Sequence, residues 1–180
     1  MLVVVAATER ELAFVRGAET FCCGVGPLDA AARTAAELAR RRPAAVLHIG
    51  LAGARGLEPP ALVLGSESVY SDVIDSGSSF PRVERLEPDA ALLAAARAAL
   101  PEAHVLPIGT SGRVGGGGAD VEAMEGFGVL RACALAGVPA VELRAVSNHV
   151  GEADRAKWRF DDALAALGAA VERLVPALGC

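Results

Sequence analysis

Two short segments place polar side chains where apolar stretches of the chain end. Glu125 follows Met124 after one such stretch, and Asn148 follows Ser147 after the next. Ligand sites in open α/β sheets lie outside the carboxyl ends of the strands, so we expect these four side chains to share one crevice. A carboxylate only accepts hydrogen bonds, whereas a carboxamide both donates and accepts them. The set therefore suits a ligand that combines sugar hydroxyls with a heterocyclic base.

The hydrophobic pattern predicts strands that alternate with helices. The expected strands cover residues 2–7, 20–23, 44–49, 62–70, 104–109, 120–124 and 138–146, and the expected helices cover residues 27–41, 88–100, 126–136 and 161–178. Such alternation is typical of the α/β class with a mainly parallel sheet. The length of 180 residues favours a single domain, residues 1–180.

Composition excludes several classes of protein. The net charge is −5, and no basic run could neutralise phosphates, which argues against nucleic-acid binding. The apolar runs are too short to span a membrane, and the first residues lack the basic segment of a signal peptide. We therefore expect a cytoplasmic protein. The three histidines show no metal-ligand spacing, and we expect neither a metal ion nor an organic cofactor.

Five motifs occur along the chain in a fixed order. They are AATERE (6–11), GVGP (24–27), HIGLAG (48–53), VEAMEGFGV (121–129) and the segment from Ser147 to Trp158. In this order they resemble the purine nucleoside phosphorylase/nucleosidase superfamily, over most of the chain. The last two motifs most resemble its futalosine hydrolases, which remove hypoxanthine from futalosine in a menaquinone pathway. The resemblance implies a three-layer α/β/α sandwich with a mostly parallel, mixed central sheet and a nucleoside as small-molecule partner.

The resemblance also implies a catalytic role for Glu11 and Asn148 and a substrate-binding role for Glu125. Glu11 stands three residues after Thr8, at the position of the water-activating carboxylate, which selects it over Glu9. A carboxylate near the anomeric carbon can orient and deprotonate the attacking water. Glu125 would accept hydrogen bonds from the ribose hydroxyls, and Met124 would pack against the sugar.

Base choice and the attacking group are expected to depend on two further motifs. Adenine-cleaving relatives carry Asp at the position of Asn148, whereas Asn, together with Ser147, fits a 6-oxopurine such as hypoxanthine. Gly50 and Leu51 fall in the glycine-rich turn that adjoins the substrate. Phosphorolytic relatives tend to have Ser at the position of Leu51, and Leu offers phosphate no donor. Hydrolysis is therefore favoured over phosphorolysis.

The end of the last motif is expected to face the 5′ side of the substrate. Trp158 could cover the benzoate-bearing chain that futalosine carries at its 5′ position, or could be part of the core. Asp154 and Arg155 are expected to form a surface pair. The cation for the benzoate is left open among Arg113, Lys157 and Arg159.

Relatives assemble as dimers or larger oligomers, and we expect a homo-oligomer. The loop from Ser71 to Arg82, with Phe80, is the candidate for completing a neighbour's pocket.

Other functions stay open at this stage. A methylthioadenosine/adenosylhomocysteine nucleosidase conflicts with Asn148, and a nucleoside phosphorylase conflicts with Leu51. A catalytically inactive nucleoside-binding module is the alternative outside enzymes, because the glycine tract from Gly115 to Gly118 replaces a longer loop of relatives.

Overall fold

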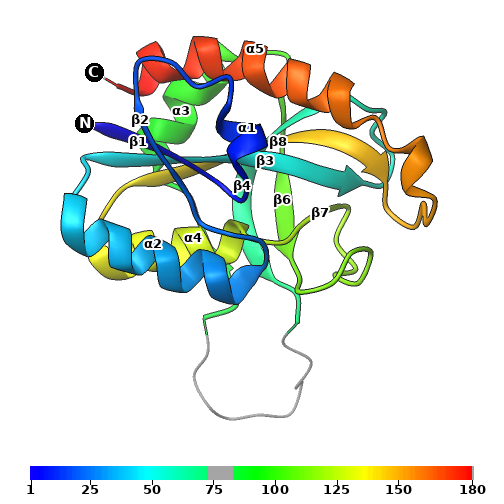
Figure 1. Ribbon diagram of the computed structural model, residues 1–180, viewed down its shortest axis with the longest axis horizontal. Coiled ribbons are helices and arrows are strands. Elements are labelled where there is room, and N and C mark those ends of the chain that lie inside the picture. Colours follow the sequence, from blue (N-terminus) through cyan, green and yellow to red (C-terminus); the bar gives the residue numbers. More distant parts are fainter. Residues whose placement is uncertain (73–82, 180) are drawn as a thin grey trace.

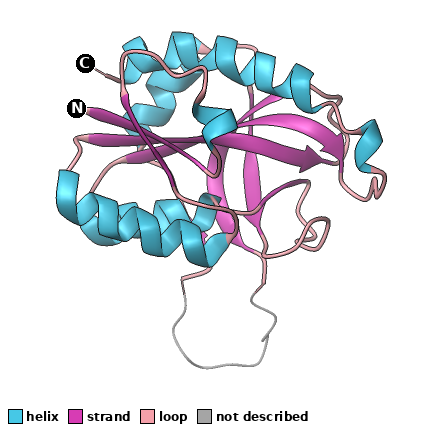
Figure 2. Ribbon diagram, in the orientation of Figure 1, coloured by secondary structure: helices cyan, strands magenta, loops and turns pink. Residues whose placement is uncertain are grey.

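A mixed β-sheet lies between two layers of helices (Figure 1, Figure 2). The structure, a computed structural model, describes residues 1–72 and 83–179. In chain order the elements are β1 (Leu2–Ala6), α1 (Glu9–Leu12), β2 (Glu19–Cys22), α2 (Pro27–Arg41), β3 (Ala45–Ala54), β4 (Leu62–Tyr70), β5 (Arg85–Leu86), α3 (Ala90–Ala99), β6 (His104–Thr110), β7 (Val121–Ala123), α4 (Gly126–Ala136), β8 (Ala140–His149), the 3-10 helix η1 (Arg155–Lys157) and α5 (Phe160–Leu178). The predicted α/β sandwich is confirmed.

Part of the sheet closes on itself. Strand β8 pairs with β3 on one side and β4 on the other, while β6 and β7 connect β4 back to β3. The pairings β3–β7, β4–β5 and β4–β8 are antiparallel and the others are parallel. Apolar side chains from all five strands of this ring form a buried cluster of their own, which includes Val63, Ile108 and Val146. The alternate residues of these strands therefore face outward.

Each helical layer buries one face of the sheet. Helices α1, α3 and α5 cover the face that carries Val4, Leu47 and Leu143. Helices α2 and α4 cover the opposite face, where Val3 and Val5 point. Successive side chains of a strand point to opposite faces, so the continuous Val run of β1 supplies both cores.

Most predicted elements are present, with corrections at their ends. Strand β3 runs through the glycine-rich segment to Ala54, and β8 runs to His149, because the two strands stay paired up to that point. The segment from Gly50 to Gly53 is therefore strand rather than turn. Elements α1, β5 and η1 were not predicted, since each has four residues or fewer and no periodicity to detect.

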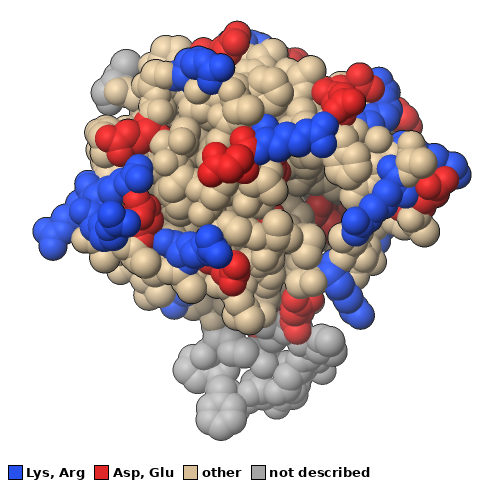
Figure 3. Space-filling model, viewed as in Figure 1, with Lys and Arg blue, Asp and Glu red and all other residues tan. Residues whose placement is uncertain are grey.

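Charged side chains of both signs are spread over the surface. Acidic and basic side chains are interspersed over the face in Figure 3 and form no continuous basic surface there. Among the described helices, none is long and apolar enough to cross a membrane. The predicted loop from Ser71 to Arg82 with Phe80 lies largely outside the described residues.

Candidate active site

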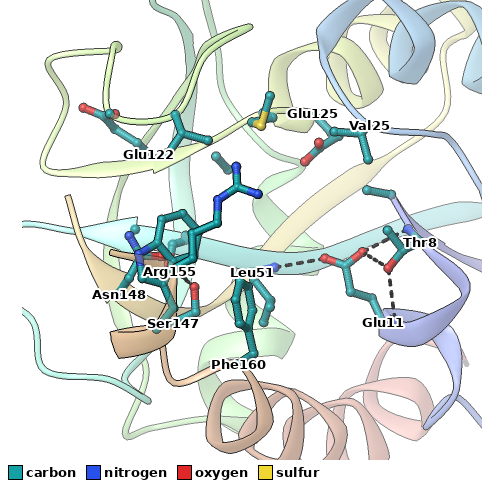
Figure 4. A pocket seen from close by; sticks show the side chains of 18 of the residues that line it. Thr8, Glu11, Val25, Leu51, Glu122, Glu125, Ser147, Asn148, Arg155 and Phe160 are labelled. Atoms are coloured by element: carbon teal, nitrogen blue, oxygen red, sulfur yellow. Dashed lines mark hydrogen bonds between the residues drawn. The ribbon is translucent and has the colours of Figure 1, made fainter. Parts of the chain in front are cut away.

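A cavity of about 470 Å³ opens above the ends of β3, β7 and β8. This volume is within the range of about 300–1,000 Å³ that is usual for small-molecule sites. Its lining brings together Glu11, Leu51, Met124, Glu125, Ser147, Asn148 and Trp158, all predicted site residues. Figure 4 shows Glu11 and Thr8 on one side of the cavity, Ser147 and Asn148 on the opposite side, and Glu122 and Glu125 on a third. Gly50 does not line the cavity, which corrects its predicted place.

Glu11 lies at the start of α1 as part of a capping box. Its Oε2 accepts hydrogen bonds from the backbone N of Thr8 at 2.9 Å and from Thr8 Oγ1 at 2.7 Å, while Thr8 caps the helix in return. The Oε1 atom accepts from Leu51 N at 3.2 Å. The residue is only 8% exposed, so it is not a solvated helix-start Glu. Oε1 keeps a free lone pair that is available to a water or a ligand.

Glu125 begins α4, and its carboxylate is held from two sides. Oε1 accepts a hydrogen bond from Gly26 N at 3.1 Å, and Oε2 lies 3.4 Å from Arg144 Nη1. Gly26 has φ +94°, a backbone conformation that favours glycine. The glycine turn before α2 thus presents a backbone N–H to the carboxylate. Glu125 is 5% exposed.

Arg144 forms the centre of a buried polar cluster beneath the cavity. Its Nε donates to Glu142 Oε1 at 2.8 Å, and its Nη2 lies 2.5 Å from His48 Nε2. Its Nη1 lies 3.4 Å from both Leu51 O and Glu125 Oε2. Of these residues, Arg144, Glu142 and His48 were not singled out from the sequence as site residues. The alternation of Glu142 and Arg144 in an apolar strand resembles a solvated face, yet both side chains are 1% exposed.

The protonation of this cluster follows from its geometry and burial. His48 Nδ1 lies 3.1 Å from Val5 O, which only accepts, so Nδ1 carries the proton and Nε2 accepts from Arg144. Burial and the neighbouring Arg144 charge hold the pKa of His48 well below its usual value. Burial raises the pKa of Glu142, and the Arg144 charge opposes that rise. The imidazole is therefore a neutral support for the guanidinium.

Two glycines leave room for this cluster. A Cβ at Gly50 would overlap Arg144 Nη1, and a Cβ at Gly126 would overlap the Glu142 carboxylate. Gly50 therefore acts beneath the site, and the glycine after Glu125 is required by close packing.

Ser147 and Asn148 end β8 and are almost fully buried. Ser147 Oγ donates to Asn148 Oδ1 at 2.8 Å, and Asn148 Nδ2 donates to His149 O at 3.1 Å. These contacts fix the orientation of the amide. A Cβ on Gly53 would lie 3.0 Å from Nδ2, which is closer than an ordinary contact, so the amide packs directly over Gly53.

Trp158 and Arg155 lie at the outer edge of the cavity. Trp158 Nε1 donates to Glu152 O at 2.9 Å, and its ring packs against Phe160 with centroids 5.4 Å apart. Arg155 Cζ lies 5.6 Å from the Trp158 ring centroid. The predicted surface pair is wrong, because Asp154 caps η1 through Ala156 N and makes no ion pair with Arg155.

The three candidate cations for the benzoate differ in whether they line the cavity. Lys157 pairs with Glu152 at 3.3 Å and Arg159 with Asp162 at 2.7 Å, and neither lines the cavity. Arg113 does line it, as does Arg155. The glycine tract borders the cavity through Gly115.

Comparisons with known sequences identify the family. The Phosphorylase superfamily pattern matches residues 20–118 and 113–177. A futalosine hydrolase of Streptomyces coelicolor is 41% identical over 190 residues, which cover 90% of this chain and 80% of that protein. A futalosine hydrolase of Thermus thermophilus is 52% identical over 58 residues, 32% of this chain and 26% of that protein.

Solved structures share the fold. A 5′-methylthioadenosine/S-adenosylhomocysteine nucleosidase of Helicobacter pylori superposes with a TM-score of 0.85 at 17% identity, covering 99% of this chain and 97% of that one. A futalosine hydrolase mutant of Helicobacter pylori gives a TM-score of 0.84 at 17% identity, covering 98% of this chain and 99% of that one. At these identities the likeness concerns the fold alone.

Proposed function

This chain belongs to the phosphorylase superfamily and, within it, to the futalosine hydrolases, and on that basis we propose that it hydrolyses the N-glycosidic bond of futalosine. The products are hypoxanthine and dehypoxanthine futalosine, and the reaction belongs to menaquinone biosynthesis in the cytoplasm. The observation that carries the proposal is the buried Glu11 carboxylate facing a cavity that Glu125 and Asn148 also line.

Glu11 acts as the general base. Thr8 supplies two hydrogen bonds to Oε2, and Leu51 N supplies one to Oε1, so the carboxylate is oriented before substrate arrives. Water held by Oε1 attacks the anomeric carbon and gives a proton to Glu11. The C–N bond breaks, and its electron pair leaves with the base. The departing purine takes up a proton from solvent, and Glu11 releases its proton to solvent.

Glu125 binds the ribose. Its carboxylate accepts hydrogen bonds from the sugar hydroxyls, while Gly26 N and Arg144 hold it in place. Met124 packs against the apolar face of the sugar. Positive charge that develops on the ribose in an oxocarbenium-like transition state is stabilised by the two carboxylates.

Asn148 binds the base. Ser147 occupies Oδ1 and leaves an N–H of Nδ2 for a purine acceptor, O6 or N7. An amide cannot act as a general acid, so it assists departure of the base by hydrogen bonding.

Leu51 favours water over phosphate as the attacking group. Its side chain lines the cavity without a donor, and its backbone N–H is already bonded to Glu11. The adjacent Glu11 carboxylate would also repel a phosphate anion.

The test is base release from futalosine with and without phosphate, followed by chromatography. We expect hypoxanthine and the free sugar product at a rate that is independent of phosphate and unaffected by chelators. A sugar 1-phosphate that forms only when phosphate is present would contradict the proposal.

We also propose a homo-oligomer. Support comes from exposed apolar side chains. Val25 at 60% and Val114 at 54% line the cavity, and Leu28 at 81% follows Val25 closely along the chain. Contacts with a second copy would bury them. Light scattering after size-exclusion chromatography gives the subunit number, and a monomer at micromolar concentration would contradict this proposal.

A further inference from the structure

Three arginines line the cavity, and they differ in the partners of their side chains. Arg10 pairs with Asp161 at 2.5 Å, and Arg113 donates to Gly116 O at 3.4 Å. Arg155 is exposed, and within residues 1–72 and 83–179 its side chain has neither an ion pair nor a hydrogen bond. All five N–H donors of its guanidinium are therefore available to a ligand.

The rim segment that carries Arg155 holds it in place without using these donors. Arg155 begins η1, and its Cζ lies 5.6 Å from the centroid of the Trp158 ring, over the face of that ring. A guanidinium is attracted to an aromatic face at this distance. Trp158 is fixed in turn, because its Nε1 donates to Glu152 O at 2.9 Å. The backbone N of Arg159 donates to Ser147 O at 2.8 Å, which ties the segment to the end of β8.

The carboxylates of the cavity do not account for the charge of Arg155. Glu122 and Glu125 each pair with another arginine, at 2.9 and 3.4 Å. Glu11 accepts its hydrogen bonds from Thr8 and from a backbone N–H. In Figure 4 the Arg155 side chain extends toward the centre of the cavity from the side opposite Glu11. Its positive charge is therefore available to an anionic group of the ligand.

We infer that Arg155 binds the carboxylate of the substrate's 5′ benzoate and makes the site selective for an acidic aromatic substituent. This inference rests on the proposed function. A guanidinium can hold a carboxylate through two parallel N–H···O bonds. The Trp158 ring beside it gives the aromatic group of the ligand a surface to pack against. The cation and the aromatic ring together match both parts of a benzoate.

The contact acts on binding rather than on bond cleavage. Arg155 and Trp158 lie at the outer edge of the cavity, whereas Glu11 lies on its opposite side. A group that is remote from the reacting atoms contributes equally to the ground state and the transition state, so its loss raises KM and leaves kcat unchanged. Affinity for a ligand that carries the benzoate therefore measures the contact directly.

The test uses calorimetry on the full chain with two ligands that cannot be hydrolysed. One is dehypoxanthine futalosine, which carries the ribose and the benzoate, and the other is the same compound with its carboxylate converted to a primary carboxamide. The unmodified chain is expected to bind the acid about tenfold or more tighter than the amide, because hydrogen bonds between charged groups are stronger than neutral ones.

Two substitutions of Arg155 separate its charge from its packing. Arg155→Met keeps an apolar side chain against Trp158 and removes the charge, so the preference for the acid should fall to about twofold or less. Its affinity for the amide should stay unchanged, which shows that the rim is intact. Arg155→Lys keeps the charge without the planar fork and should retain part of the preference.

Two other cations supply controls. Lys157→Met is the matched control, because Lys157 belongs to the same 3-10 helix but pairs with Glu152 at 3.3 Å outside the cavity. It should leave both affinities unchanged. Arg113→Met removes another lining arginine and should keep the preference for the acid.

Two outcomes would overturn the inference. One is equal affinity of the unmodified chain for the acid and the amide. The other is a preference for the acid that survives in Arg155→Met, and its loss in Arg113→Met instead would move the contact to Arg113. A chain that shows the expected preference but releases no hypoxanthine from futalosine would refute the proposed function and leave the anion site in place.

Discussion

The floor of the cavity and its rim both carry charged side chains but hold them differently. The floor cluster, formed by Arg144, Glu142, His48 and Glu125, is buried, and each member has a fixed partner. The rim, residues 150–160, carries exposed ion pairs and an aromatic pair. Buried charges are costly to leave unpaired, whereas exposed pairs contribute little. On the proposed function, the floor therefore holds the ribose-binding Glu125 in place, and the rim can vary with the substrate's 5′ substituent.

The largest expected effect on stability comes from removing the Arg144 charge at the floor. Arg144→Met leaves the buried Glu142 without its partner and should lower the free energy of unfolding by about 3–5 kcal/mol. Arg159→Met at the rim breaks an exposed pair and should cost less than about 1 kcal/mol. Urea denaturation of the two variants gives both values. Equal losses would remove the distinction between floor and rim.

The next effect concerns catalysis. Glu11→Gln should reduce kcat on futalosine by a factor on the order of 10²–10⁴ with little change in KM, because it removes the base and leaves ribose binding intact. Glu9, an exposed neighbour on the same helix, supplies the control Glu9→Gln. Near-normal turnover in Glu11→Gln, with loss in Glu9→Gln, would assign the base to the other carboxylate.

The buried His48 should make the free energy of unfolding depend on pH. The folded pKa of His48 lies below its unfolded value of 6.5, so the unfolded state binds more protons as pH falls through 6.5. Stability should therefore decrease by about 1.4 kcal/mol between about pH 7.5 and about pH 5.5 through this group.

A comparison of two variants isolates the contribution of His48 to the pH dependence of stability. In His48→Gln this part of the pH dependence should vanish, while in the exposed control His104→Asn it should remain. Parallel stability curves for the unmodified chain and His48→Gln would show that His48 does not titrate in this way.

At the rim the expected effect is on substrate choice. Trp158→Ala should lower kcat/KM for futalosine roughly tenfold relative to inosine, since it removes an aromatic contact to the 5′ substituent. Steady-state kinetics on both substrates measure this ratio. Equal losses on the two substrates with a lower Tm would mean that Trp158 only supports the fold.

The sequence predicted most elements and most cavity residues, because these features depend on residues that are neighbours along the chain. Helix α2 follows from apolar spacing and Pro43, and the strand-end position of Asn148 follows from the apolar run before it. Closure of the ring could not be predicted, because antiparallel pairing of β4 with β8 joins segments about 80 residues apart.

Partners from distant segments explain the missed site residues. Arg144 is buried because His48, Glu125 and Glu142 surround it, and only Glu142 is close in sequence. Glu122 belongs to the same motif as Glu125, yet its place beside Asn148 depends on strand register across Gly53. Charged residues at alternate positions of an apolar strand are the signal that could have identified both.

Base release by the unmodified chain tests the central claim most directly. Futalosine and methylthioadenosine are supplied separately without phosphate, and kcat/KM is compared for the two. The account predicts rapid release of hypoxanthine from futalosine and almost none of adenine from methylthioadenosine, because the Asn148 amide matches a 6-oxopurine. Faster release of adenine would contradict it and favour a methylthioadenosine nucleosidase.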